Sequence, residues 1–161
     1  MWLGSRALSA RPTVILRKGS VEGQQIFGSA PRTEERFGDV AGLKILGVNI
    51  VTLAPGEHSA QKHWHSGSDE FIMVLEGMAT VIEDDAATQI GPGDMALWPA
   101  ASEIGHQIVN RSQAPLRYLC AGTNPDAETV RYPDQGETLH WIRPDWHVQG
   151  DDGTVRRRGT E

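Results

Sequence analysis

The chain has 161 residues, of which 39% are hydrophobic, and this is the size and composition of one globular domain. Its formal net charge of −6 leaves no broad basic face to replace phosphate counterions, so we expect no nucleic-acid partner. A single cysteine, Cys120, excludes an internal disulfide, and no apolar run reaches the roughly 18 residues that would cross a membrane. These features predict a cytoplasmic protein with no membrane partner.

From Val14 onward the sequence consists of short apolar segments separated by turn residues. TVIL and QQIF are candidate opening strands, and residues 30–44 read as a polar loop. A strand rich in β-branched residues, ILGVNIVTL, ends at Pro55-Gly56, and FIMVLEG and MATVIEDD form two arms around Gly77. Further short strands follow in ATQIGPGD, MALWPA, HQIVN and LRYLCAG. Turn signals recur about every eight to twelve residues, which is typical of an all-β sandwich or barrel.

The chain shows no internal repeat, so the pattern predicts one barrel. We divide it into an N-terminal arm with outer strands (1–44), a barrel core (45–123) and a C-terminal extension (124–161). The extension contains three prolines and two tryptophans within residues 125–147. We expect it to be irregular, to pack on the outside of the barrel and to end in a frayed tail.

Four residues with metal-binding side chains fall on the predicted strands. His63 and His65 are two residues apart and therefore project from the same face of a strand. Glu70 opens the next strand after a short turn, and His106 begins a later one. Three imidazoles and one carboxylate suit Fe, Mn, Ni, Co or Zn better than Ca or Mg, which prefer oxygen ligands. Four ligands on a six-coordinate ion leave two positions open for substrate.

At these positions the sequence resembles the cupin superfamily. The first cupin motif corresponds to Gly56, His63-Trp64-His65, Glu70 and Gly77, and the second to Gly93, Pro99, His106 and Asn110. The resemblance implies that His63, His65, Glu70 and His106 hold one divalent transition metal. The gap between Pro99 and His106 is longer than usual, which leaves a three-ligand site without His106 as an alternative.

A narrower likeness covers residues 38–71 and the stretch TNPDAETVRYPD. Both resemble a group of small single-domain bacterial cupins that is often labelled sugar-phosphate isomerase-like. This likeness implies an all-β double-stranded β-helix, the cupin jelly-roll barrel, with irregular N- and C-terminal arms. It also implies a homodimer.

Several functions fit this set of residues. The first is a metal-dependent enzyme on a small oxygen-rich molecule, such as a sugar-phosphate isomerase; an Fe(II) dioxygenase or a lyase fits the same ligands. The second is a non-enzymatic cupin that senses or binds a small ligand, and the third is a structural barrel without metal. Gln61 and Trp98 are candidates for the substrate pocket, although Gln61 could instead support a ligand and Trp98 could be a core residue. No residue stands out as the proton-transfer group.

Overall fold

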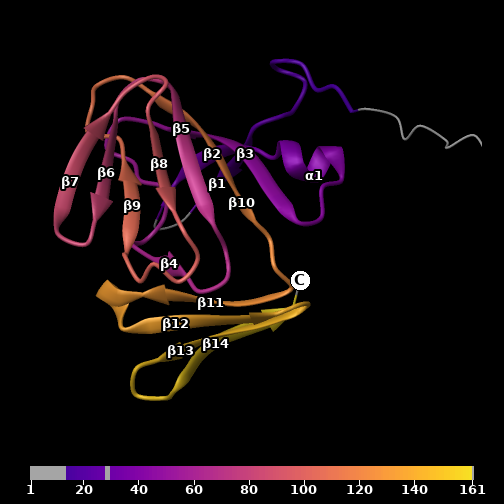
Figure 1. Cartoon of the computed structure of the whole chain (residues 1–161), viewed down its shortest axis with the longest axis vertical. Helices are drawn as coiled ribbons and strands as arrows, with labels where there is room; N and C mark the ends of the chain where they lie inside the picture. Colours follow the sequence, from indigo (N-terminus) through magenta and orange to yellow (C-terminus); the bar gives the residue numbers. More distant parts are fainter. Residues whose placement is uncertain (1–13, 28–29, 161) are drawn as a thin grey trace, which may run out of the picture.

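The computed structural model describes residues 14–27 and 30–160, which fold mainly into antiparallel strands. Two sheets face each other across one hydrophobic core and form the barrel in the upper part of Figure 1. The larger sheet has the spatial order β1 (Gln24–Ile26), β2 (Arg32–Glu35), β3 (Leu46–Leu53), β10 (Leu116–Thr123), β5 (Glu70–Glu76), β8 (Met95–Trp98). The smaller sheet has the order β7 (Ala86–Ile90), β6 (Ala79–Glu83), β9 (His106–Val109). This is the predicted jelly-roll barrel.

Alternation along the strands explains the core. In β5, Ile72 and Val74 are each only 1% exposed and point inward, whereas their neighbours point outward. Leu53 of β3 and Leu116 of β10 lie opposite each other and are fully buried. Together with the inward residues of β6, β8 and β9 they form one continuous hydrophobic cluster.

The turn between β5 and β6 explains one glycine of the first motif. Gly77 has φ +84°, a conformation that L side chains rarely adopt. A Cβ atom at this position would lie 2.5 Å from the carbonyl oxygen of Pro115. The close approach of the 115–116 backbone therefore requires glycine here.

A third sheet lies beneath the barrel (Figure 1). It has the order β14 (Val155–Thr160), β13 (Asp145–Gly150), β12 (Glu137–Ile142), β11 (Ala127–Tyr132), β4 (Trp64–His65), with a short 3-10 turn at Pro133–Gln135 between β11 and β12. The prediction of an irregular extension with a frayed tail was wrong, because these strands are regular as far as Thr160. The prolines do not interrupt the strands, since Pro133 and Pro144 lie in the turns on either side of β12.

The N-terminal region also differs from the prediction. QQIF contains β1 as expected, but residues 14–16 of TVIL form no strand; Thr13 lies outside the described residues. The predicted loop contains β2 and a short helix, α1 (Phe37–Ala41). β2 was missed because its inward residue is Glu34, which is 8% exposed and pairs with Arg32 at 2.7 Å and Arg36 at 3.1 Å. In the described part of the chain, no helix is long and apolar enough to cross a membrane.

Candidate metal centre

The backbone places two of the predicted ligands side by side. His63 and His106 form a reciprocal antiparallel pair: the N–H of His63 donates to the carbonyl oxygen of His106 at 3.1 Å, and the N–H of His106 donates back at 2.9 Å. Residues paired in this way project from the same face of a sheet. Their ring centroids are accordingly 4.9 Å apart.

Glu70, the first residue of β5, completes a compact group with these histidines. Its Oε2 lies 3.4 Å from Nε2 of His106, and ligand atoms of His63, Glu70 and His106 all lie within 4.8 Å of one another. One ion that binds each ligand at about 2.0–2.2 Å requires ligand atoms roughly 3–3.6 Å apart, and the 3.4 Å between Glu70 and His106 is already of this size. We call these three residues the ligand cluster.

His65 lies at the edge of the ligand cluster. Its Nε2 is 3.5 Å from Oε2 of Glu70, while its Nδ1 is 3.2 Å from Oε2 of Glu128 in β11. Ser68 donates to the same Glu128 oxygen at 2.9 Å. The longer Pro99–His106 gap therefore does not separate His106 from the group, and His65 is the more peripheral of the predicted ligands.

The hydrogen bonds of the imidazoles determine which ring nitrogen is free. Nδ1 of His63 lies 2.8 Å from the carbonyl oxygen of Gln61, and Nδ1 of His65 faces the Glu128 carboxylate. A carbonyl oxygen can only accept, so the proton of the neutral His63 ring sits on Nδ1 and leaves Nε2 as the nitrogen that can bind a metal. The contact of His65 Nδ1 with Glu128 is the kind of supporting hydrogen bond found at metal-ligating histidines.

The protonation states also suit a cation. Burial lowers the pKa of His63 to about 4, so its ring is neutral at neutral pH. Burial alone would raise the pKa of Glu70, but the hydrogen bond and charge of His106, together with His63 and His65, lower it to about 2. Burial opposes a charge on His65, yet its hydrogen bond to Glu128 raises its pKa. A metal would therefore compete with a proton at His65, and acid would weaken binding.

Aromatic and polar side chains pack around the cluster. Trp98 is 4% exposed and stacks on His106, with ring centroids 4.0 Å apart and planes 10° apart, while its Nε1 donates to Glu83 at 2.8 Å. On the opposite side the ring of Tyr132 stacks on His63 at 5.8 Å. Cys120 Sγ lies 3.4 Å from Oε1 of Glu70. The structure thus places Trp98 in the wall behind His106.

Sequence reasoning missed Glu128, Tyr132 and Cys120. Glu128 and Tyr132 lie in TNPDAETVRYPD, a stretch that supports the narrower likeness, but no spacing rule connects it to His63 or His65. Glu128 is 63 residues from its partner His65 in sequence, and they meet only because β11 pairs with β4. Cys120 lies on β10, where it pairs with Ile72 of β5, and the apolar composition of that strand gave no sign of a polar contact.

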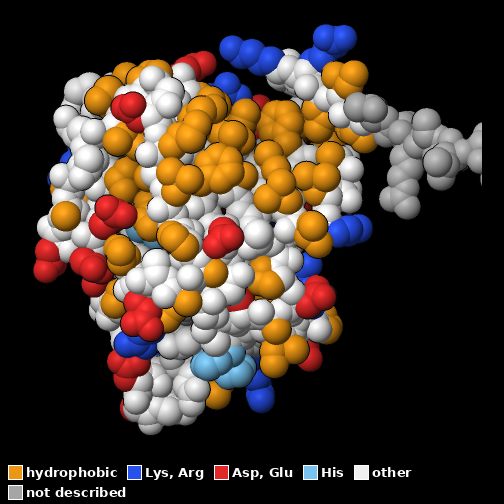
Figure 2. All heavy atoms as spheres, viewed as in Figure 1, with side chains coloured by type: hydrophobic (Ala, Val, Ile, Leu, Met, Phe, Trp, Pro, Cys, Tyr) orange, Lys and Arg blue, Asp and Glu red, His pale blue; other side chains and the backbone are white. Residues whose placement is uncertain are grey.

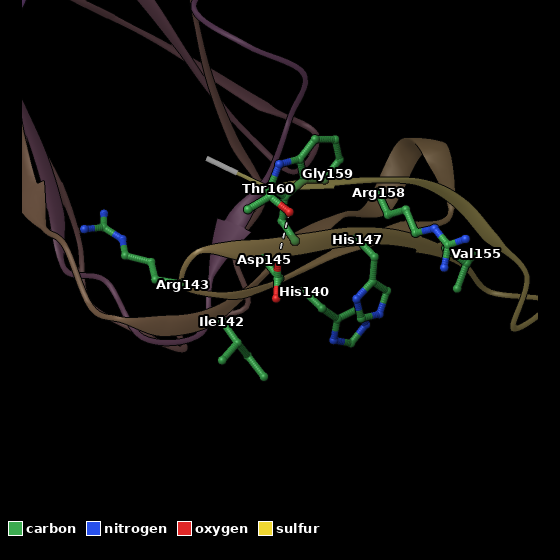
Figure 3. A pocket seen from close by; sticks show the side chains of 10 residues that line it. His140, Ile142, Arg143, Asp145, His147, Val155, Arg158, Gly159 and Thr160 are labelled. Carbon is green, nitrogen blue, oxygen red and sulfur yellow. Dashed lines mark hydrogen bonds between the residues drawn. The ribbon is translucent and has the colours of Figure 1, made fainter.

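The cavities of the protein lie at different distances from this cluster. One of about 740 Å³ is lined from β12, β13 and β14 by residues including His140, His147 and Arg158, and it contains no cluster residue (Figure 3). Side chains alternate along β12, so Leu139 and Trp141 lie on one face of the sheet and His140 lies on the other. Leu139 pairs with Val130 on the face toward the barrel, so His140 and this cavity lie on the face that points away from the barrel. Another, of about 620 Å³, is lined by Gln61 and Tyr132, which both contact His63.

The fold and this cluster define a jelly-roll barrel with an interior group of imidazole and carboxylate ligands. The chain belongs to the cupin superfamily, since the cupin domain family matches residues 49–122 and a cupin relative covers nearly the whole chain. This relative is a sugar phosphate isomerase from Silicibacter pomeroyi, with 33% identity, a TM-score of 0.82 and coverage of 89% of this chain and 97% of that chain.

Two further structures are similar to the chain. A protein from Acidithiobacillus ferrooxidans with a provisional assignment as sugar phosphate isomerase is 25% identical, with a TM-score of 0.82 and coverage of 90% of this chain and 97% of that one. A predicted oxalate decarboxylase from Thermotoga maritima shares the fold at 18% identity and a TM-score of 0.59, over 70% of this chain and all of that one. No curated protein matches the chain.

The contact between His65 and Glu128 leads to a first prediction. Glu128→Ala removes the carboxylate that orients His65, so we expect the affinity for Zn(II) or Mn(II) to fall about ten- to hundredfold. Competition with a fluorescent chelator measures this affinity. Glu76→Ala is the matched control, because Glu76 is a solvent-exposed carboxylate at the far end of β5. Equal affinity in the Glu128→Ala and wild-type proteins would show that Glu128 does not support the site.

Proposed function

We propose that the protein is a divalent-metal-dependent enzyme that acts on a small polyhydroxylated substrate, in the manner of a sugar-phosphate isomerase. The observation that carries this proposal is the group of imidazole Nε2 atoms and one ionised carboxylate that face each other inside the barrel. The similarity to sugar phosphate isomerases over nearly the full chain supports the substrate class. His63, Glu70 and His106 would hold the ion, with His65 as a fourth ligand.

The surrounding residues support chemistry on an oxygen-rich molecule. A divalent metal in this site would polarise a substrate carbonyl and hydroxyl. Gln61 and Gln135, whose side-chain amides are hydrogen-bonded at 3.0 Å, line the cavity beside His63 and offer further donors and acceptors for hydroxyl groups. Burial raises the pKa of Tyr132, so its phenol remains a hydrogen-bond donor at neutral pH. Trp98 fills the wall behind His106 and excludes water there.

Solvent exchange tests the proposed reaction. Aldose–ketose isomerisation moves a hydrogen between neighbouring carbons, so a protein loaded with Fe(II), Mn(II), Co(II), Ni(II) or Zn(II) should convert an aldose phosphate into the ketose phosphate in D₂O. Proton NMR of pentose and hexose phosphates measures this conversion, and deuterium in the product distinguishes proton transfer through an enediol from a hydride shift. We expect conversion with at least one metal and not after chelation. Failure with all five metals across these substrates would contradict the isomerase proposal.

An Fe(II) dioxygenase is the second candidate, because two histidines with a carboxylate also suit iron and O₂. Oxygen uptake that depends on Fe(II) and on an organic substrate would favour it. Metal-dependent ligand binding without any turnover would instead favour a sensor. The cytoplasmic location stays a prediction.

We also propose that the protein is a homodimer. Hydrophobic side chains gather over β5, β8 and β10 on the outer face of the larger sheet (Figure 2), where Met95 is 52% and Leu97 66% exposed. A groove of about 380 Å³ on this face is lined by Leu46, Phe71 and Leu97. Continuous apolar patches on a protein surface mark interaction sites.

Light scattering after size-exclusion chromatography tests the dimer. We expect twice the 17.6 kDa chain mass for the wild type and a monomer for Leu97→Asp, because a charge would be buried in the interface. Ile142→Asp is the matched control, since Ile142 is 70% exposed but lies on the C-terminal sheet. A monomeric wild type, or a loss of the dimer in both variants, would contradict this interface.

A further inference from the structure

A cavity of about 620 Å³ opens between the barrel and the C-terminal sheet, next to the ligand cluster. The barrel contributes Arg32, Ala60 and Gln61 to its lining, and the C-terminal region contributes Tyr132, Gln135, Glu137, Arg156 and Arg157. Gln61 bonds His63 through its carbonyl oxygen, and Tyr132 stacks on the His63 ring. A substrate that reaches the cluster from this side would therefore leave its far end among the arginines.

The charge of this lining is opposite to that of the chain. The protein carries −6 overall, but three guanidinium groups and one carboxylate line the cavity, so its lining carries an excess of positive charge even though Arg32 also pairs with Glu34 behind it. The carboxylate is already engaged, because Glu137 accepts from Arg156 at 3.0 Å and from Arg157 at 2.9 Å, each on a different oxygen. It holds the two arginines in place at one wall of the cavity.

The arginines are anchored but retain donors. Arg32 is fixed by Glu34 at 2.7 Å and by the carbonyl oxygen of Ala30 at 3.0 Å. Arg157 uses only Nη2, toward Glu137, so in the described part of the chain its Nε and Nη1 groups have no protein acceptor. A guanidinium carries five N–H donors in a planar fork that matches the oxygens of a phosphate. The cavity thus offers oriented donors and an excess of positive charge.

We propose that this cavity binds the phosphate group of a phosphorylated polyhydroxy substrate, with Arg157 as its main contact and with the hydroxyl and carbonyl end of the substrate at the ligand cluster. A phosphate monoester carries about −1.5 to −2 charges at pH 7 and three acceptor oxygens, so it gains more from these positive donors than a carboxylate, which carries one charge. This inference rests on the proposed function for what happens to the substrate at the ligand cluster. The binding of a phosphate group in the cavity does not depend on that reaction.

Binding to the metal-free protein tests this inference without any turnover. Isothermal titration calorimetry with ribose 5-phosphate, ribose and inorganic phosphate gives the three affinities. We expect ribose 5-phosphate and phosphate to bind and ribose to bind at least about tenfold more weakly. Arg157→Gln should weaken binding of both phosphate compounds about tenfold, because it removes a charge-assisted hydrogen bond.

Arg158→Gln is the matched control. It makes the same charge change one residue further along β14, but Arg158 lines the cavity on the opposite face of the sheet (Figure 3). We expect its phosphate affinity to remain within about twofold of the wild type. An equal loss in both variants would reduce the effect to general electrostatics and overturn the inference, as would unchanged binding in Arg157→Gln.

The remaining outcomes separate this inference from the proposed function. Arg157-dependent phosphate binding without isomerisation would support the cavity and contradict the isomerase. Isomerisation with no preference for phosphorylated sugars would support the isomerase and overturn the cavity. Tighter binding of ribonate than of ribose 5-phosphate would overturn the phosphate assignment in favour of a carboxylate.

Discussion

The double variant His63→Ala/His106→Ala should lose its bound metal. We expect the wild type, after removal of any affinity tag and reconstitution with a divalent metal, to hold close to one ion per chain, and the variant less than about a tenth of that. The two imidazoles form a direct cross-strand pair and supply two of the three cluster ligands. The double variant therefore keeps only Glu70 of the ligand cluster. Elemental mass spectrometry of the dialysed proteins measures the metal content.

A control of the same composition is available in the C-terminal sheet. His140 and His147 are also a cross-strand pair, with rings stacked at 4.7 Å, but they face away from the barrel (Figure 3). His140→Ala/His147→Ala should retain the metal. If this control lost as much metal as the first variant, or if the first variant kept its metal, the ligand assignment would be wrong.

His65→Ala then distinguishes a three-ligand from a four-ligand site. His65 is close to Glu70 but lies outside the group whose ligand atoms are within 4.8 Å of one another. A metal content close to that of the wild type, with weaker affinity, would indicate three ligands with His65 in a supporting role. Loss of the metal would indicate four.

The second large effect should be on stability. Asn110→Ala should lower the free energy of unfolding by about 3–5 kcal/mol, because it leaves several buried backbone groups without partners. Asn110 is fully buried, and its Nδ2 donates to the carbonyl oxygens of Leu53 at 3.0 Å and Ala114 at 2.8 Å. Its Oδ1 accepts from the backbone N–H of Ser112 at 3.0 Å and from the Ser112 hydroxyl at 2.8 Å. Urea denaturation followed by circular dichroism measures the loss.

Ser112→Ala provides a graded comparison for this prediction. It keeps both hydrogen bonds from Asn110 to the carbonyl groups and removes only hydroxyl contacts that are partly exposed. We expect a cost of about 1 kcal/mol. A cost for Asn110→Ala no larger than that for Ser112→Ala would show that the amide does not hold this turn. The last residue of the second cupin motif thus acts as a structural residue between β9 and β10.

The sequence predicts the barrel strands well because their pattern is local. Short apolar runs, such as FIMVL in β5 and YLCA in β10, and the glycine at position 77 are sufficient to indicate short antiparallel strands and a tight turn. The sequence is less informative where charged side chains are buried as ion pairs, as at Glu34 in β2. A strand with such charged residues has the polar composition that is typical of a loop. The sequence is also misleading in the C-terminal region, where prolines suggested irregular structure but occupy turns.

The sequence alone determined the class of the fold and the residue types that could bind a metal, because each motif lies within one continuous segment of the chain, Gly56–Gly77 or Gly93–Asn110. Only the tertiary structure decided which of these residues meet. The pairing of His63 with His106 depends on strand register, and Glu128 reaches His65 only through the pairing of β11 with β4. The arginine-lined cavity likewise combines β2 with β14. Such contacts depend on the packing of distant strands, which no local pattern specifies.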